Sequence, residues 1–404
     1  MTAPPAIPAA TYRLQFSKAF GFRDATALVP YLHQLGISHL YASPFLKARA
    51  GSPHGYDLID YNRLNPEVGD EAELAALADA LAARGMGLIL DFVPNHMGVA
   101  QADNAWWLDV LEWGPASPCA DFFDIDWTPA KAALRGRVLL PFLGDHYGRV
   151  LEKGELVLKF DAAAGSFGVW YWDHLFPIRP PHYADILQPW LAARRAEGEG
   201  GGETLAALDA LMTKARWLRV GNLPVGRRPA VREHAAAFKR ELAALARREP
   251  SVRQAIESAV AAVNGTPGKP RSFQTLHRLL ERQAYRLAFW GAAADEINYR
   301  RFFDINDLAG LKMEKSELFE TAHRLVFRLL REGKLQGLRI DHVDGLFDPR
   351  RYCRRLAERA TAEMAAAPAR DGAAAAGTRP YIVVEKILAH HESMRADWAV
   401  DGTT

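Results

Sequence analysis

Three apolar stretches of this sequence end in polar residues that could carry out chemistry. The first runs into Asp91 and on to His96, the second contains Arg339 and Asp341, and the third ends at Glu385. A charged group in an apolar strand is costly unless it is paired. Helix capping would explain some Asp or Asn residues at such ends. Capping explains neither a Glu directly after Ile-Val-Val nor an Arg and an Asp inside one apolar strand.

Two carboxylates on neighbouring strand ends suit the chemistry of glycosidic bonds. In a retaining mechanism one carboxylate is the nucleophile and the other is the acid and base. We expect Arg339 to hold Asp341 ionised, because a nearby opposite charge favours the carboxylate. We expect desolvation to keep Glu385 protonated as the acid, because this residue emerges from an apolar strand.

A metal site is the competing interpretation of the second cluster. Asp341, His342 and Asp344 carry side chains that could coordinate a cation. Alternate residues of a strand face opposite sides of a sheet, which weakens this alternative. We therefore expect neither a metal nor a cofactor.

The segments that position these clusters alternate between strand and helix patterns. Strand patterns occur at 11–16, 37–42, 87–93, 337–341 and 381–386. Helix patterns occur at 22–34, 71–84, 316–331 and 349–367. The nearly continuous apolar run at 87–93 is typical of a strand buried on both faces of a parallel sheet. The alternation predicts an α/β fold, and the polar clusters fall where (β/α)8 barrels place their active sites.

The predicted strands number five, whereas a closed (β/α)8 barrel needs eight. We predict the N-terminal five βα units of a TIM barrel, apparently truncated, with a large mixed insertion after the third strand. Residues 1–98 would hold strands one to three, and 312–404 strands four and five, so that the chain ends before strands six to eight. A doubly wound sheet could also stop at five, but no Gly-rich phosphate loop follows the first strand.

The inserted subdomain, 99–311, is predicted to be β-like first and helical afterwards. Its β-like part covers 120–172, with hairpin-type turns at 143–145 and 164–165. Long helices are expected at 235–262 and 273–299. Two low-complexity tracts, 197–203 and 373–377, are interpreted as loops.

Composition excludes several classes of function. The chain has 404 residues and a net charge of +2, with 50 basic and 48 acidic side chains, which argues against a nucleic-acid partner. Cys119 and Cys353 are the only cysteines, so a disulfide framework is not expected and a reducing compartment is favoured. The first ten residues lack the features of a secretory signal. No apolar run is long enough for a membrane span, and we expect a cytoplasmic protein.

Four segments together resemble the α-amylase superfamily, glycoside hydrolase family 13. They are DFVPNH at 91–96, GLRIDH at 337–342, VVE at 383–385 and HGYDLIDY at 54–61. They are similar to the strand-end motifs of that superfamily and occur in the same order. The resemblance implies a TIM-barrel fold and activity on α-glucans.

Within the superfamily, the chain is most similar to the maltooligosyltrehalose synthases. The similarity rests on segments at 11–16, 38–44, 297–304, 338–346 and 397–404. Members of that family are considerably longer, so the chain resembles their N-terminal part. The third catalytic carboxylate of the superfamily lies on a later strand and has no counterpart here. The resemblance therefore leaves open whether this chain is active by itself.

The resemblance also implies roles for individual residues. Asp341 would be the nucleophile and Glu385 the general acid and base. The implied substrate-binding residues are Tyr56, Asp57, His96, Arg339, His342 and Asp344.

The reaction implied by the resemblance is an intramolecular transglucosylation. The reducing-end α-1,4 bond of a maltooligosaccharide or glycogen-derived α-1,4-glucan becomes an α,α-1,1 bond, giving maltooligosyltrehalose. A trehalose-releasing hydrolase could act next in sequence, and no membrane or nucleic acid takes part. Two alternatives stay open: another α-glucan hydrolase or glucanotransferase, or a silent fragment that only binds glucan. The aromatic run at 170–172 either covers the site against water or packs in the core of the insertion.

Overall fold

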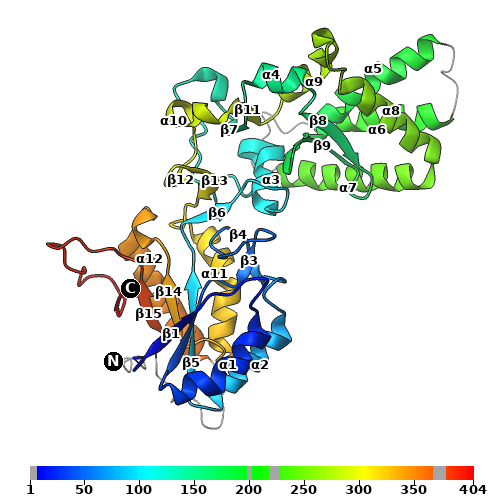
Figure 1. Ribbon diagram of the computed structural model, residues 1–404. Coiled ribbons are helices and arrows are strands. Elements are labelled where there is room, and N and C mark those ends of the chain that lie inside the picture. The colour runs from blue at the N-terminus through cyan, green and yellow to red at the C-terminus, as the bar shows by residue number, and fades with distance from the viewer. Residues whose placement is uncertain (1–6, 198–202, 219–227, 367–378) are drawn as a thin grey trace. The chain divides into compact units, whose positions relative to one another are not determined.

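One parallel sheet brings the three polar clusters to the same edge. The computed structural model describes residues 7–197, 203–218, 228–366 and 379–404 (Figure 1). Its parallel sheet contains six strands. Their order is β1 (Thr11–Leu14), β2 (His39–Ala42), β5 (Gly87–Phe92), β14 (Gly337–Ile340), β15 (Tyr381–Val384) and β16 (Gly402–Thr403). All neighbouring pairs are parallel. The central strands β5 and β14 are buried along their whole length, as expected for strands covered on both faces.

The chain forms two compact units. The first comprises Met1–Val99, Asp121–Asp124 and Arg300–Thr404, and the second comprises Ala100–Ala120 and Ile125–Tyr299. The parallel sheet belongs entirely to the first unit. The chain thus returns to the first unit at Arg300, within the segment assigned to the insertion on sequence grounds.

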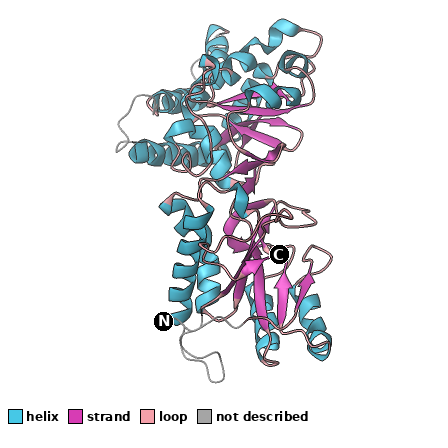
Figure 2. Ribbon diagram, turned by 90° about the vertical axis from the view of Figure 1, so that its left-hand side faces the viewer, coloured by secondary structure: helices cyan, strands magenta, loops and turns pink. Residues whose placement is uncertain are grey.

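Helices follow the strands of the first unit, and Figure 2 shows them beside the sheet. They are α1 (Phe22–Gln34), α2 (Glu71–Ala82), α11 (Ser316–Arg331) and α12 (Pro349–Ala365). The helix α2 begins at an N-cap, Asp70, whose carboxylate accepts the amide of Glu73 at 2.9 Å. The helix α1 packs on α2 and α11 packs on α12. These elements confirm the predicted βα alternation.

The prediction of five parallel strands is not confirmed, because β16 adds a sixth. The amide of Asp401 donates to the carbonyl of Ile382 at 2.7 Å, and the amide of Thr404 donates to that of Val384 at 3.0 Å. The Asp401 carboxylate also accepts the Ile382 amide at 2.8 Å and Arg379 at 2.9 Å. A two-residue strand carries no alternation of apolar and polar residues, so its sequence gives no strand pattern.

Short antiparallel strands extend the first unit beyond the parallel sheet. They are β3 (Leu46–Ala48) with β4 (Leu58–Leu64), and β6 (His96–Gly98) with β13 (Ile305–Gly310) and β12 (Arg301–Phe302). The Arg300 guanidinium fixes this return of the chain. It donates to Asn95 Oδ1 at 2.7 Å, to Asp124 Oδ2 at 2.9 Å and to the carbonyl of Leu311 at 2.7 Å.

The second unit mixes two small sheets with helices. Its strands are β7 (Val138–Leu143) paired with β11 (Tyr285–Phe289), and β8 (Val157–Asp161), β9 (Ser166–Tyr171) and β10 (His174–Pro177). Its helices are α3 (Ala105–Trp113), α4 (Tyr147–Glu152), α5 (Tyr183–Ala196), α6 (Glu203–Arg216), α7 (Arg228–Arg248), α8 (Pro250–Val263), α9 (Gln274–Leu280) and α10 (Ala293–Glu296).

Three details of the insertion were predicted incorrectly. The helix expected over 235–262 is split into α7 and α8, because Pro250 starts a new helix at its first position. The helix expected over 273–299 ends at Leu280, and β11 follows because it pairs with β7. The turn at 143–145 leads into α4 rather than a hairpin, whereas the turn at 164–165 does join β8 to β9.

Among the described residues, no helix combines the length and apolar character needed to cross a membrane. The low-complexity tracts interpreted as loops, 197–203 and 373–377, fall wholly or largely outside the described residues.

The helix α11 supplies a large apolar face to the core of the first unit. This burial predicts how much stability is lost when a leucine side chain on that face is shortened to alanine. Leu329 is fully buried there, whereas Leu35 at the end of α1 is 52% exposed. Leu329→Ala should lower the free energy of unfolding by about 2–5 kcal/mol, because it leaves a cavity. Leu35→Ala should change it by less than about 0.5 kcal/mol. Equal effects of the two substitutions in urea unfolding would contradict this packing.

Candidate active site

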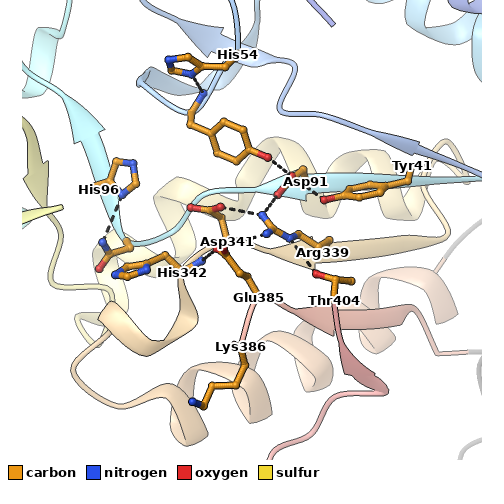
Figure 3. A network of polar contacts seen from close by, with 12 residues as sticks. Tyr41, His54, Asp91, His96, Arg339, Asp341, His342, Glu385, Lys386 and Thr404 are labelled. Atoms are coloured by element: carbon orange, nitrogen blue, oxygen red, sulfur yellow. Dashed lines mark hydrogen bonds and ion pairs between the residues drawn. The ribbon is translucent and has the colours of Figure 1, made fainter. Parts of the chain in front are cut away.

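One guanidinium group joins three carboxylates at the carboxyl ends of the central strands. Arg339 Nη1 donates to Asp91 Oδ1 at 2.8 Å and to Asp341 Oδ1 at 2.8 Å. Its Nη2 lies 3.4 Å from Glu385 Oε2. Figure 3 shows these side chains converging from β5, β14 and β15. Asp341 and Glu385 therefore face the same guanidinium.

The register of the sheet produces this convergence. Arg339 is paired with Asp91 on one side and with Val383 on the other. The ladder continues past the strand ends, since the amide of Asp341 donates to the carbonyl of Phe92 and the amide of Glu385 to that of Ile340, both at 2.8 Å. Backbone hydrogen bonds thus position Asp341 and Glu385 independently of the contacts that their side chains make.

Asp91 was not among the predicted site residues, yet it is the most densely bonded carboxylate of the group. Besides Arg339, it accepts the hydroxyls of Tyr41 at 2.9 Å and Tyr56 at 2.6 Å on its Oδ2. Tyr56 in turn accepts Arg13 Nη2 at 3.1 Å. The signal in the sequence was an acidic residue near the end of a fully apolar run, which must be paired if it is buried.

Arg339 was expected to hold Asp341 ionised, and its charge does lower the pKa of this carboxyl, but burial outweighs that effect. Burial is the main cause and raises the pKa of Asp341 to about 7. The Arg339 charge opposes this rise, but it is shared with Asp91, and the carboxylates of Asp91 and Glu385 add to the rise.

Desolvation falls on Asp341 more than on Glu385, contrary to the sequence argument. The Asp341 side chain is 8% exposed and that of Glu385 is 32% exposed. Glu385 is instead held by a hydrogen bond, because its Oε2 accepts the backbone amide of His342 at 2.9 Å. Its orientation is therefore fixed while part of the side chain reaches solvent.

His342 turns the chain sharply after β14. Its φ is +45°, in the left-handed region that non-glycine residues rarely adopt. A Cβ on Gly345 would lie 2.4 Å from the His342 ring and 2.6 Å from Asn95 Oδ1, so only glycine fits there. The His342 ring packs against Phe302 and Phe303, and burial lowers its pKa.

His96 presents a neutral ring with one unused nitrogen. Burial lowers the pKa of His96 to about 3, so the imidazole is uncharged at neutral pH. Its Nδ1 lies 3.3 Å from Asn95 Nδ2, and its ring centroid lies 4.3 Å from that of Phe302. Its Nε2 is buried and has no partner at ordinary hydrogen-bond geometry among the described residues, although a hydrogen bond to the Tyr56 backbone partly offsets the fall in the pKa of this ring. An unpaired buried nitrogen of this kind suits a hydroxyl of a bound ligand.

Besides His96, whose ring meets Asn95 and Phe302, two more predicted site residues lie outside the Arg339 network. The Asp57 carboxylate accepts Ser52 Oγ at 2.5 Å within its own loop. Asp344 is exposed, with Oδ2 3.4 Å from Lys386 Nζ. Over the described ranges, no three His, Cys, Asp or Glu side chains are grouped as metal ligands would be, and this includes Asp341, His342 and Asp344.

Comparison with known proteins places this geometry in context. Residues 24–150 match the family described as Alpha amylase, catalytic domain. The chain is 33% identical, over 400 residues, to a putative maltooligosyl trehalose synthase of Mycobacterium tuberculosis, covering 98% of this chain and 36% of that protein. It is 30% identical over 132 residues to the alpha-amylase SusG of Bacteroides thetaiotaomicron, covering 32% of this chain and 18% of that protein.

A solved structure also resembles the chain. The maltooligosyltrehalose synthase from Arthrobacter ramosus superposes with a TM-score of 0.64 at 33% identity, covering 98% of this chain and 37% of that one. The chain thus spans little more than a third of the length of the two synthases.

The raised pKa of Asp341 predicts a specific dependence of stability on pH. The folded-state pKa of about 7 lies above the ordinary value of 3.8. Ionising Asp341 therefore costs stability progressively as the pH rises from about 4 to about 7. Asp341→Asn removes this cost. The melting temperature of the variant minus that of the unsubstituted protein should therefore increase between pH 4 and pH 8. A difference in melting temperature that is the same at pH 4 and pH 8 would contradict this electrostatic description.

Proposed function

We propose that this chain, which belongs to the alpha-amylase family, supplies the reacting carboxylates of a maltooligosyltrehalose synthase. The main observation in support is that Asp341 and Glu385, on neighbouring strand ends, both contact the Arg339 guanidinium. The 33% identity to synthases over 98% of the chain supports the choice of reaction. The product would be a maltooligosaccharide ending in an α,α-1,1-linked trehalose unit.

The first step would break the α-1,4 bond at the reducing end. The Asp341 carboxylate attacks the anomeric carbon of the penultimate glucose and forms an ester. Glu385, in its protonated form, donates its proton to the oxygen of the leaving terminal glucose. The Arg339 guanidinium, 2.8 Å from Asp341 Oδ1, favours the ionised form of Asp341 that attacks as the nucleophile.

The second step would form the new bond. The released glucose turns so that its anomeric hydroxyl faces the anomeric carbon that is bonded to Asp341. Glu385, now a carboxylate, accepts the proton of that hydroxyl as its oxygen attacks, and Asp341 leaves as a carboxylate. Two inversions at the same carbon keep the α configuration on the donor sugar. Water in place of the glucose hydroxyl would give hydrolysis instead.

The residues around the carboxylates would hold the donor sugar. His96 Nε2 is buried and unpaired among the described residues, so it is suited to a sugar hydroxyl. Arg339 and the Tyr56 hydroxyl are fixed by Asp91, so they need little reordering when substrate binds. His342 positions Glu385 through its backbone amide. The Asp57 and Asp344 carboxylates bond to Ser52 and Lys386, so they would contact the substrate outside the reacting subsite.

The setting of the reaction is part of the proposal. An α-1,4-glucan is the substrate, and a hydrolase that cleaves the α-1,4 bond beside the terminal trehalose unit would use the product. We place both enzymes in the cytoplasm. The chain has only two cysteines, Cys119 and Cys353, which agrees with a reducing compartment.

Product analysis with maltopentaose tests this function. The concentration of reducing ends should fall while no glucose is released, because isomerisation converts maltopentaose into a non-reducing product. Glu385→Gln should lower kcat about 10²–10⁴-fold, since the variant can neither donate nor accept the proton. Glu358→Gln, on the exposed side of α12, is the matched control and should keep full activity.

Two results would overturn the proposal. Equimolar release of glucose with new reducing ends would assign a hydrolase, the alternative within the same family. Wild-type turnover by Glu385→Gln would show that another residue supplies the proton.

A further inference from the structure

The sheet β8–β9–β10 of the second unit has one buried face and one open face. On β9, Phe167, Val169 and Tyr171 point into the core and are at most 6% exposed. The alternate residues, Ser166 and Trp170, therefore lie on the opposite face. The aromatic run at 170–172 is thus divided between core and surface.

Cross-strand neighbours complete the open face. Trp170 lies beside Leu175 of β10 and across from Val157 of β8. Lys159 is paired with Gly168, and Asp161 with Ser166. The Lys159 ammonium lies 5.3 Å from the centre of the Trp170 ring. This face combines an indole surface with charged and hydroxyl groups.

One face of α3 and a lysine of α7 form the wall above the sheet. Leu108 and Asp109 lie four and three residues before Glu112, so each shares a side of the helix with it. A cavity of about 680 Å3 lies between this side of α3, Lys239 and the open face of the sheet. That volume is within the range of ligand sites in proteins.

The polar groups of the wall are held in place. Lys239 forms an ion pair with Glu112. Arg232 Nη1 donates to Asp109 Oδ1 at 3.0 Å, and the Arg232 guanidinium lies over the Trp113 ring. Fixed polar groups lose little freedom when a ligand binds.

Trp172, at the rim of this cavity, is an unexpected residue for its backbone position. It is 78% exposed and has a φ of +55° in the two-residue connection between β9 and β10. Glycine or asparagine is the usual residue at such a turn position. This left-handed conformation is strained for a tryptophan, and a side chain this exposed recovers little of the strain by packing. The conformation instead holds an indole at the mouth of the cavity.

We infer that this groove, formed by the open face of β8–β9–β10 and by α3, binds a segment of α-1,4-glucan. A pyranose ring has a flat face of C–H groups, which stacks on indole, and a rim of hydroxyls, which carboxylates accept and ammonium groups donate to. Three carboxylates, Asp109, Glu112 and Asp161, are balanced by three cations, Lys159 and Lys239 of the lining and Arg232 on Asp109, so the groove has no excess of positive charge. That balance disfavours an anionic polymer such as nucleic acid.

The choice of an α-glucan as ligand rests on the proposed function. The groove lies in the second unit, whereas the carboxylates lie in the first. It would give the protein a second contact with the polymer it acts on, which raises the local concentration of chain ends.

Electrophoresis of the whole protein in native gels containing amylopectin tests this inference. The unsubstituted protein should be slowed, and maltoheptaose should reverse the slowing. The double variant Trp170→Ala with Trp172→Ala should raise the dissociation constant for amylopectin at least about tenfold. Trp217→Ala removes an indole of the same unit that is 82% exposed and lies outside the groove, and it should migrate like the unsubstituted protein.

The remaining outcomes separate the groove from the active site. Slowing that survives the double Trp variant but is lost in Asp341→Asn with Glu385→Gln would place binding at the carboxylates and overturn the inference. Absence of slowing in the unsubstituted protein, or equal slowing by the β-glucan hydroxyethylcellulose, would overturn it as well. Isomerisation of maltopentaose, assayed in the same preparations, reports on the proposed function independently. A groove that binds in a protein without this activity would sustain the inference as a binding site alone.

Discussion

The contact between Arg339 and three carboxylates is the interaction on which the catalytic end of the sheet depends. Asp91, Asp341 and Glu385 come from three different strands, and their charges would repel one another without a shared cation. The parallel register places Arg339 between them. Tyr41 and Tyr56 then complete the hydrogen bonding of Asp91, so the guanidinium is anchored on one side and contacts Asp341 and Glu385, the proposed reacting pair, on the other.

One cation among three carboxylates leaves the site with excess negative charge in a poorly solvated place. The pKa of Asp341 is raised as a result, and an ionised Asp341 is a cost to folding that the surrounding core must offset. The same desolvation strengthens a carboxylate as a nucleophile, because less water must be removed before it attacks. Stability and chemistry are thus opposed at one residue, which is typical of active sites.

The sequence predicted the parts of this arrangement that depend on local patterns. The apolar runs predicted β5, β14 and β15, and the helical spacing predicted α1 and α11. The patterns failed where distant partners decide the structure. Residues 285–289 form a strand because β7 lies beside them, and Asp91 joins the site because Arg339 is its neighbour across the sheet. Asp57 and Asp344 belong to motifs whose other residues, Tyr56 and Asp341, join the Arg339 network. Their own carboxylates contact Ser52 and Lys386 instead, and position in the sequence does not reveal this difference.

Identification of the residue that carries a covalent glycosyl intermediate tests the central claim most directly. An activated 5-fluoro-α-glycosyl fluoride needs no acid catalyst to form the ester, so the Glu385→Gln variant should accumulate the intermediate. Peptide mass spectrometry of the trapped protein should place the added sugar on Asp341. A sugar on any other residue, or a trapped intermediate in Asp341→Asn, would contradict the assignment of Asp341 as the nucleophile held by Arg339.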